Sequence, residues 1–377
     1  MRKITRKEFC EGMVVATAIP ILFPASVFSS VPAPIDSKKR ILGQFFTEKS
    51  SWLLPHIRDF ITSSRCRVVY DPFAGTGCLI AAVKKGVSSI TEGKGLDIDR
   101  SLGWDYNDSL IEIPHVDDAI IVTNPPYISN YSARRKKINR ELDKYFASTN
   151  YDDIYLLALD RMLEAQKYIV AIVPETFINS PYKQKNRLSS VTVLEENPFN
   201  DTSTPVVVVC FDSVSKSLDN IKVYKNSTYI CTLGEVEDCR LVPDNSVKMK
   251  FNAPSGWLAV RCVDSTNPED RLRYAFKQDL DYDWENGIKA SSRLLTLIEI
   301  DVPYDKRALF IAQCNQLLEN IRKRSHDMIL SPFKGNAKNG LRRRRLDFMT
   351  CRAIIERVYC RIMQKQSIMQ TELSTKD

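Results

Sequence analysis

The four consecutive residues Asn124, Pro125, Pro126 and Tyr127 combine groups that could act on a primary amine. Two successive prolines lack backbone N–H groups and stiffen the turn. The Asn124 side-chain oxygen and the Pro125 carbonyl can then both accept hydrogen bonds inside one small cavity. An exocyclic NH2 group has two donors to match them, and accepting both biases its nitrogen toward a tetrahedral geometry with an available lone pair. We therefore predict that this turn activates an amino group, with Tyr127 stacked on the target ring.

A second motif lies upstream, in the seven residues Asp71–Gly77, whose sequence is DPFAGTG. Gly75 and Gly77 allow the backbone to turn tightly and let a ligand lie against bare main chain. A dinucleotide-binding loop would carry a third glycine three residues further on, but Ile80 stands there. The loop therefore does not predict an NAD site, and a plain turn does not account for the Asp and Phe that flank its glycines.

The elements that must position these motifs are predicted by the hydrophobic pattern. Between residues 65 and 211, apolar runs of strand length alternate with helical stretches, which is typical of a parallel α/β sheet. The expected strands are Cys66–Tyr70, Gly95–Ile98, Ala119–Thr123, Tyr168–Val173 and Val206–Phe211. The stretches Leu79–Lys85 and Asp153–Ala165 have apolar residues at helical spacing and should cover the sheet faces. Both motifs then follow strands directly, at the edge where open sheets bind ligands.

Two acids close the second expected strand. Asp97 lies at its carboxyl end, where a carboxylate can accept hydrogen bonds from both hydroxyls of a ribose. Asp99 stands where an Asp usually caps the following helix. A nucleoside-containing cofactor is therefore expected beside the DPFAGTG loop.

Together, DPFAGTG and NPPY resemble the motifs of S-adenosylmethionine-dependent DNA methyltransferases that modify the N6 amine of adenine. Their order, with the cofactor motif first and the recognition region last, resembles the gamma arrangement of that family. The resemblance covers about residues 41 to 212. It implies a class I methyltransferase α/β fold: a mostly parallel, seven-stranded sheet with helices on both faces, followed by a basic, mixed α/β target-recognition domain. It also implies that the substrate is a flipped-out adenine in duplex DNA and that the enzyme belongs to a type II restriction-modification system.

The resemblance carries roles to individual residues. The residues that the resemblance implies for catalysis are Asn124, Pro125, Pro126 and Tyr127. Cofactor contacts fall to Thr47, Asp71, Phe73, Ala74, Gly75, Gly77, Asp97, Asp105 and Tyr106. In this set Thr47 would face the methionine end of the cofactor, Asp105 would take the adenine amine, and Tyr106 would pack on the adenine ring. Phe199 would pack on the flipped base, although a buried core Phe is an equal alternative. The reaction needs no metal.

Positive charge is concentrated near the end of the chain. The whole chain of 377 residues has a net charge of +8, but residues 320 to 366 hold 13 Lys and Arg against 3 Asp and Glu. A solvated helical face is the plain explanation, yet four consecutive arginines are dense for that purpose. We predict phosphate contacts from Arg322, Lys323, Arg324, Lys334, Lys338, Arg342, Arg343, Arg344 and Arg345.

The expected organisation has three parts: an extension over residues 1–40, a catalytic domain over 41–213 and a target-recognition region over 214–377. In the extension, basic residues 2–7 and the apolar run Met13–Phe23 resemble an export signal. An added helix or a misplaced start codon is the alternative. The ten scattered cysteines, with no C-x-x-C pair, predict neither a zinc site nor disulfides, and favour the cytosol.

Other functions are compatible with part of this sequence pattern. NPPY also occurs in enzymes that methylate a glutamine amide of proteins or an adenine of RNA, and a DNA-binding homologue without activity would keep the fold. The basic segment and the DPFAGTG loop favour DNA over both other substrates. We expect a monomer that protects DNA from a separate restriction endonuclease. Beyond residue 213 we identify no motif that predicts a recognition sequence.

Overall fold

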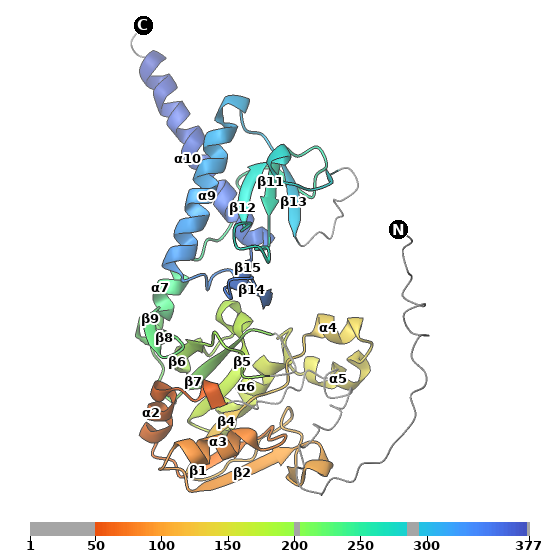
Figure 1. Ribbon diagram of the computed structural model, residues 1–377, viewed down its shortest axis with the longest axis vertical. Helices are drawn as coiled ribbons and strands as arrows, with labels where there is room; N and C mark the ends of the chain where they lie inside the picture. The colour runs from red at the N-terminus through yellow and green to blue at the C-terminus, as the bar shows by residue number, and fades with distance from the viewer. Residues whose placement is uncertain (1–49, 200–203, 285–293, 375–377) are drawn as a thin grey trace, which may run out of the picture. The chain divides into compact units, whose positions relative to one another are not determined.

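The computed structural model describes residues 50–199, 204–284 and 294–374. Their main element is a nine-stranded mixed sheet with the strand order β3-β2-β1-β4-β5-β7-β6-β8-β9 (Figure 1). Its strands are β1 (Val68–Asp71), β2 (Glu92–Asp97), β3 (Asp105–Tyr106), β4 (Ala119–Thr123), β5 (Ile169–Pro174), β6 (Leu188–Val193), β7 (Val206–Phe211), β8 (Lys222–Lys225) and β9 (Thr228–Thr232). The sequence pattern predicts β4 and β7 to the residue.

The five strands from β3 to β5 are mutually parallel, so their carboxyl ends share one edge of the sheet. β7 is antiparallel to both β5 and β6. The sheet is wider than the seven strands expected, because the hairpin β8–β9 pairs with the edge of β6. The sheet therefore continues beyond residue 213 into the segment expected to form the recognition region.

Helices cover both faces of the sheet. They are α2 (Pro55–Ser63), α3 (Cys78–Gly86), α4 (Asn130–Arg135), α5 (Asn139–Phe146), α6 (Ile154–Ala165) and the short α7 (Leu233–Glu237). α2 and α3 bury their apolar residues against the strand side chains on one face of the sheet. α6 packs against the strand side chains on the opposite face. This alternation follows from the two-residue period of a strand. The helices predicted at 79–85 and 153–165 are α3 and α6.

The C-terminal part has a different architecture. An antiparallel sheet has the order β10-β13-β11-β12, and a separate hairpin pairs β14 with β15. The strands are β10 (Met249–Phe251), β11 (Leu258–Arg261), β12 (Arg273–Phe276), β13 (Leu295–Ile300), β14 (Ser331–Asn336) and β15 (Arg342–Arg345). Two long helices, α9 (Arg307–Arg324) and α10 (Phe348–Ser374), contact one another and cross in the view of Figure 1.

Across the described residues, none of the helices combines the length and the apolar composition that crossing a bilayer requires. The expected extension over residues 1–40 and the expected cofactor contact Thr47 lie outside the described residues.

Candidate active site

The DPFAGTG loop connects β1 to α3 at the carboxyl edge of the sheet. Gly75 and Gly77 have φ values of +52° and +77°, in the left-handed region that favours glycine. A Cβ atom at Gly77 would lie only 2.8 Å from Cζ2 of Trp104. The Trp104 indole also donates a hydrogen bond of 2.8 Å to the Gly75 carbonyl. Trp104, which precedes the predicted contacts Asp105 and Tyr106 and had no predicted role, therefore holds the turn in place.

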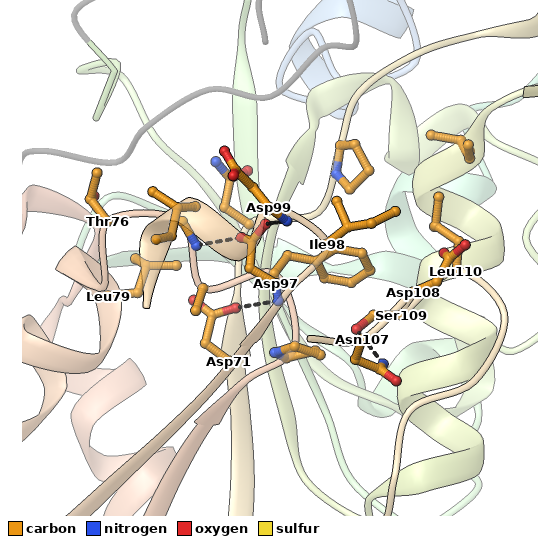
Figure 2. A pocket seen from close by; sticks show the side chains of 18 of the residues that line it. Asp71, Thr76, Leu79, Asp97, Ile98, Asp99, Asn107, Asp108, Ser109 and Leu110 are labelled. Atoms are coloured by element: carbon orange, nitrogen blue, oxygen red, sulfur yellow. Dashed lines mark hydrogen bonds between the residues drawn. The ribbon is translucent and has the colours of Figure 1, made fainter. Parts of the chain in front are cut away.

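Asp97 ends β2 and faces the same loop (Figure 2). One of its carboxylate oxygens accepts the Gly75 N–H at 2.9 Å, and the other accepts the Asp99 N–H at 2.8 Å. A carboxylate oxygen can accept more than one hydrogen bond, so both oxygens retain capacity for a ligand. Asp99 accepts the Ser101 N–H at 3.0 Å and begins a short 3-10 helix, η2 (Arg100–Leu102), which is the capping role expected for it.

Asp71, at the end of β1, connects the two motifs. Its side chain is only 1% exposed. One carboxylate oxygen accepts the Thr123 hydroxyl at 2.5 Å and the Phe73 N–H at 3.0 Å. Thr123 ends β4 and directly precedes Asn124, so this contact fixes the loop against the NPPY turn. Burial raises the pKa of Asp71 to about 7, against 3.8 ordinarily.

Some residues of the NPPY turn line a cavity, and others are buried in the core. Asn124 and Pro126 line the cavity, whereas Pro125 is buried. The Tyr127 hydroxyl donates to the Ile172 carbonyl of β5 at 2.7 Å. The Tyr127 ring contacts the Phe199 ring edge-on, with centroids 6.2 Å apart, and Phe199 is 4% exposed within the core. Phe199 is thus a buried core residue next to the NPPY turn, which is the alternative that the sequence left open for it.

One cavity brings most of the predicted cofactor residues together (Figure 2). Its lining comes from the DPFAGTG loop, the ends of β2 and β4, and the segment after β3. The lining residues are Asp71, Pro72, Phe73, Ala74, Gly75, Thr76, Cys78, Leu79, Asp97, Ile98, Asp99, Leu102, Asn107, Asp108, Ser109, Leu110, Asn124, Pro126, Ile128, Leu142, Tyr145 and Ile154. This set contains four Asp but neither Lys, Arg nor His, so acidic side chains outnumber basic ones in the described lining.

Asp105 and Tyr106 do not reach this cavity. They form the two-residue strand β3, both are exposed, and the Arg100 guanidinium lies 4.2 Å from the Tyr106 ring centroid. The cavity is lined instead by the next residues, including Asp108, whose carboxylate accepts the Tyr145 hydroxyl at 2.8 Å and Lys144 Nζ at 3.0 Å. Asp108 was not among the predicted contacts, because the hydrophobic pattern of so short a strand does not fix where the strand ends.

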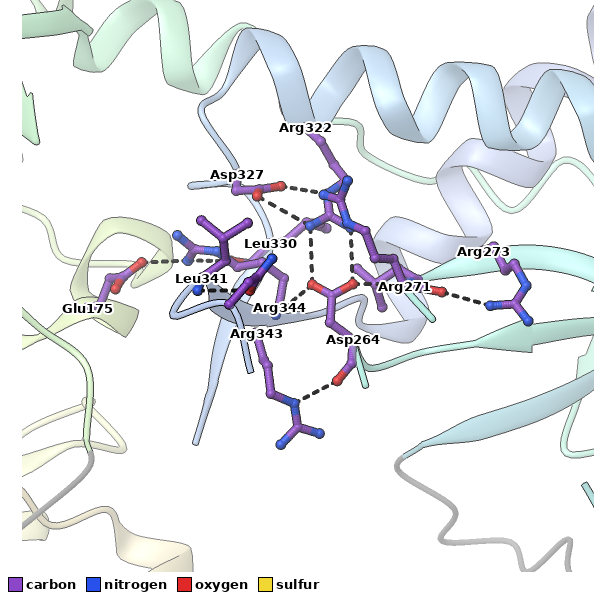
Figure 3. A network of polar contacts seen from close by, with 12 residues as sticks. Glu175, Asp264, Arg271, Arg273, Arg322, Asp327, Leu330, Leu341, Arg343 and Arg344 are labelled. Atoms are coloured by element: carbon purple, nitrogen blue, oxygen red, sulfur yellow. Dashed lines mark hydrogen bonds and ion pairs between the residues drawn. The ribbon is translucent and has the colours of Figure 1, made fainter. Parts of the chain in front are cut away.

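The predicted phosphate-contacting residues fall into two groups. Arg322 and Arg344 are each 5% exposed, and Arg342 is mostly buried. Their guanidinium groups form ion pairs with carboxylates of the protein and are not offered to solvent. Figure 3 shows Arg322 and Arg344 in this network. Arg343 is half-buried, and its Nε donates to the Asp264 carbonyl at 2.7 Å. The exposed members are Lys323, Arg324, Lys334, Lys338 and Arg345.

The described residues contain no group of three or more His, Cys, Asp or Glu arranged to hold a metal ion.

Part of this site is similar to a known protein family. Residues 111–201 match the family model of the Eco57I restriction-modification methylase. That segment contains the NPPY turn, α6 and β5, and it is similar to restriction-modification methylases; the DPFAGTG loop lies before it. No curated protein sequence matches the chain.

Several solved structures are similar to the chain. A modification subunit assigned to a type I restriction enzyme of Vibrio vulnificus YJ016 is 18% identical, with a TM-score of 0.36, over 48% of this chain and 47% of that chain. The type I restriction-modification methyltransferase subunit of Streptococcus thermophilus is 16% identical, with a TM-score of 0.35, over 52% of this chain and 53% of that chain. The EcoKI M protein is 12% identical, with a TM-score of 0.31, over 73% of this chain and 71% of that chain. The chain spans about half the length of the first two.

Proposed function

We propose that this protein is an S-adenosylmethionine-dependent DNA methyltransferase that transfers a methyl group to N6 of an adenine extruded from duplex DNA. The observation that carries the proposal is the convergence of Asn124, Asp71 and Asp97 on one cavity at the carboxyl edge of the sheet. The cofactor carries a sulfonium and an ammonium group, and the negative lining complements both charges. The family match over residues 111–201 supports the same activity.

The cavity offers a contact for each part of the cofactor. Asp97 would accept the ribose hydroxyls, because its two oxygens lie at the end of β2 beside the glycine turn. Asp108 lines the cavity and would take the adenine amine in place of Asp105, which does not. Phe73 and Leu110 supply apolar surface for the adenine ring. When bound, S-adenosylmethionine supplies an electrophilic methyl group on its sulfonium.

The NPPY turn would act on the target amine. The Asn124 side-chain oxygen and the Pro125 carbonyl accept its two N–H groups, which turns the nitrogen lone pair away from the ring. The hydrogen bond from Tyr127 to Ile172 fixes the turn against β5, so the acceptors keep their orientation. Most of the rate enhancement would come from holding amine and methyl group in line. Extrusion of the base into the site costs a few kcal/mol of stacking and pairing.

The finer classification is part of the same proposal. The order of DPFAGTG before NPPY, with a separate C-terminal part after both, supports the gamma arrangement of N6-adenine methyltransferases. The restriction-modification family match supports a role in protecting DNA from a partner endonuclease. One strand is modified at a time, which requires no molecular symmetry, and we propose a monomer that acts in the cytosol.

Transfer of radiolabelled methyl groups from S-adenosylmethionine to unmethylated genomic DNA tests the proposal. We expect label in N6-methyladenine after digestion to nucleosides. Loss of one positioned hydrogen-bonding group costs about 10²- to 10³-fold in rate, so Asn124→Ala should lose at least that factor. Asn220→Ala, at an exposed position, is the matched control. Label in RNA or in protein glutamine, or no transfer by a protein that binds the cofactor, would overturn the proposal.

A further inference from the structure

Four consecutive basic residues begin seven positions after Tyr127 of the NPPY turn, at the end of α4 and just beyond it. They are Arg134, Arg135, Lys136 and Lys137, called here the α4 cluster, and all four are exposed. α4 begins only three residues after Tyr127 and is capped by the Ser129 hydroxyl, which accepts the Ser132 N–H at 3.2 Å. A run of cations is thereby fixed beside the residues proposed to handle the target base.

The approach to α4 is tied down on both sides. The Ile154 N–H donates to the Ile128 carbonyl at 3.0 Å, and the Asn130 N–H donates to the Asp152 carbonyl at 2.8 Å. These bonds attach the segment that carries the cluster to the start of α6. The position of the α4 cluster is therefore set by the same framework that sets the NPPY turn.

A second set of cations reaches the same sheet edge from the far end of the chain. Glu175 directly follows β5 and is only 1% exposed. Its carboxylate forms ion pairs with two residues of β15: with Arg342, at 2.8 Å, and with Arg344, which is labelled in Figure 3. Arg342 also donates to the Leu194 carbonyl, just beyond β6, at 2.9 Å. The buried arginines therefore anchor the β14–β15 hairpin to the sheet.

The anchored hairpin presents exposed lysines. Lys334 lies in β14, and Lys338 lies in the connection to β15, where its N–H donates to the Thr266 carbonyl at 2.9 Å. β4 and β5 are parallel neighbours, so the segments that follow them leave the same edge of the sheet. The α4 cluster follows β4, and the hairpin is attached where β5 ends.

Electrostatics indicate that the two sets lie within reach of one another. Burial, then the charges of Arg135 and Lys334, lower the pKa of Lys136. Within residues 50–199, 204–284 and 294–374, no carboxylate forms an ion pair with Arg134, Arg135, Lys137, Lys334 or Lys338. Like charges held near one another without neutralising carboxylates favour a polyanion.

We propose that the α4 cluster and the hairpin lysines form the two sides of a binding surface for the DNA sugar-phosphate backbone, flanking the nucleotide that enters the site. This inference rests on the proposed function and names the residues by which it would hold its substrate. Phosphate contacts of this kind fix the register of a duplex without reading its sequence. They would hold the strand on both sides while the target base leaves the stack.

The test is the salt dependence of duplex binding. Fluorescence anisotropy with a labelled DNA duplex of mixed sequence measures the affinity over a range of KCl concentrations. The variants are Arg134→Ala/Arg135→Ala and Lys334→Ala/Lys338→Ala. The slope of log affinity against log salt is negative, and each lost phosphate contact makes it shallower by about 0.9. Each double variant should therefore make it shallower by about two. Lys248→Ala/Lys250→Ala removes the same charge from exposed positions on and beside β10 and should leave the slope unchanged.

Two further measurements separate the outcomes. Cofactor affinity, measured by calorimetry, should be equal in all proteins, because none of these side chains lines the cavity. An unchanged slope in either test variant, or an equal loss in the control, would overturn the two-sided surface even if the wild-type protein methylates DNA. Absence of DNA methylation by the wild type, with the slopes altered as expected, would overturn the proposed function and leave the polyanion surface standing.

Discussion

The carboxylates of the cavity and the arginines of the β14–β15 hairpin use charge in opposite ways. Asp71 and Asp97 accept hydrogen bonds from hydroxyl and backbone N–H groups, and neither forms an ion pair with a basic side chain of the described residues. Arg342 and Arg344 are instead matched to the buried carboxylate of Glu175. A charge neutralised inside the protein supports structure, whereas a charge that faces a cavity without a counterion is available to a ligand.

Breaking the ion pairs of Glu175 with Arg342 and Arg344 should give the largest effect, a loss in the free energy of unfolding. Glu175→Ala leaves two buried guanidinium groups without their carboxylate, and removal of one partner of a buried ion pair costs about 3–5 kcal/mol. Urea unfolding monitored by tryptophan fluorescence would measure this loss. Glu175→Gln keeps the side-chain shape and should lose less.

Glu164 provides the matched control for that measurement. Its ion pair with Arg161 spans 2.8 Å, but Glu164 is 62% exposed. Exposed pairs contribute about 0–1 kcal/mol, so Glu164→Ala should unfold almost as the wild type does. Equal midpoints for the Glu175 and Glu164 variants would show that the hairpin is not anchored through Glu175.

Replacing a carboxylate of the cavity should change cofactor affinity more than the stability of the fold. Asp97→Asn places an NH2 group opposite the N–H of Gly75 or of Asp99 and removes the charged acceptor for the ribose. A hydrogen bond to a charged group contributes about 1.5–3 kcal/mol, which corresponds to roughly a 10- to 100-fold weaker Kd for S-adenosylmethionine. Calorimetric titration measures it, and Asp117→Asn, at an exposed position, is the control. A Kd within about twofold of wild type would remove Asp97 from the cofactor site.

The hydrophobic pattern and motif spacing predict much of the catalytic half because its information is local. Strands β4 and β7 and the turns that follow β1 and β4 each lie within a few residues of their own signals. Asp108 was missed because β3 has only two residues, too few for an alternating pattern. The β8–β9 hairpin was missed because its place in the sheet depends on pairing with β6.

The arginines show where sequence information ends. Arg322 and Arg344 looked like phosphate ligands because composition reports charge but not burial. Their partners Asp264 and Glu175 lie 58 and 169 residues away in the sequence. Only the folded chain brings such residues together. The α4 cluster, in contrast, is a local run of four consecutive basic residues in the sequence, but it was not among the predicted phosphate contacts.

The raised pKa of Asp71 predicts a pH dependence that sharpens the contrast with the neutralised arginines. Its pKa of about 7 in the folded protein exceeds the ordinary 3.8, so the protonated form is favoured by folding. The associated stability is fully present below pH 3.8 and is lost as the pH rises through 7. A cationic ligand favours the carboxylate, so cofactor affinity should fall by up to about tenfold per pH unit below 7 and level off above it. Calorimetry in buffers of different ionisation enthalpy would detect the released proton.

Asp71→Asn provides the matched comparison for this dependence. It removes the titrating group while keeping an oxygen that can accept the Thr123 hydroxyl and the Phe73 N–H. The variant should bind more weakly at pH 8 and show a nearly flat profile. A wild-type profile that is already flat between pH 6 and 8 would show that Asp71 does not face a cationic part of the cofactor.

Two neighbouring arginines of β15 provide the smallest and most local test. Arg344 is 5% exposed and paired with Glu175, whereas Arg345 is exposed and forms no ion pair with a described residue. Arg345→Ala should leave the free energy of unfolding within about 0.5 kcal/mol of wild type. If Arg345 contacts a phosphate, the salt slope of duplex binding should fall by about one. Arg344→Ala should do the reverse, lowering stability while the slope of the folded protein stays nearly the same. A slope that falls equally in both variants would mean that net charge, rather than exposure, decides which arginines meet DNA.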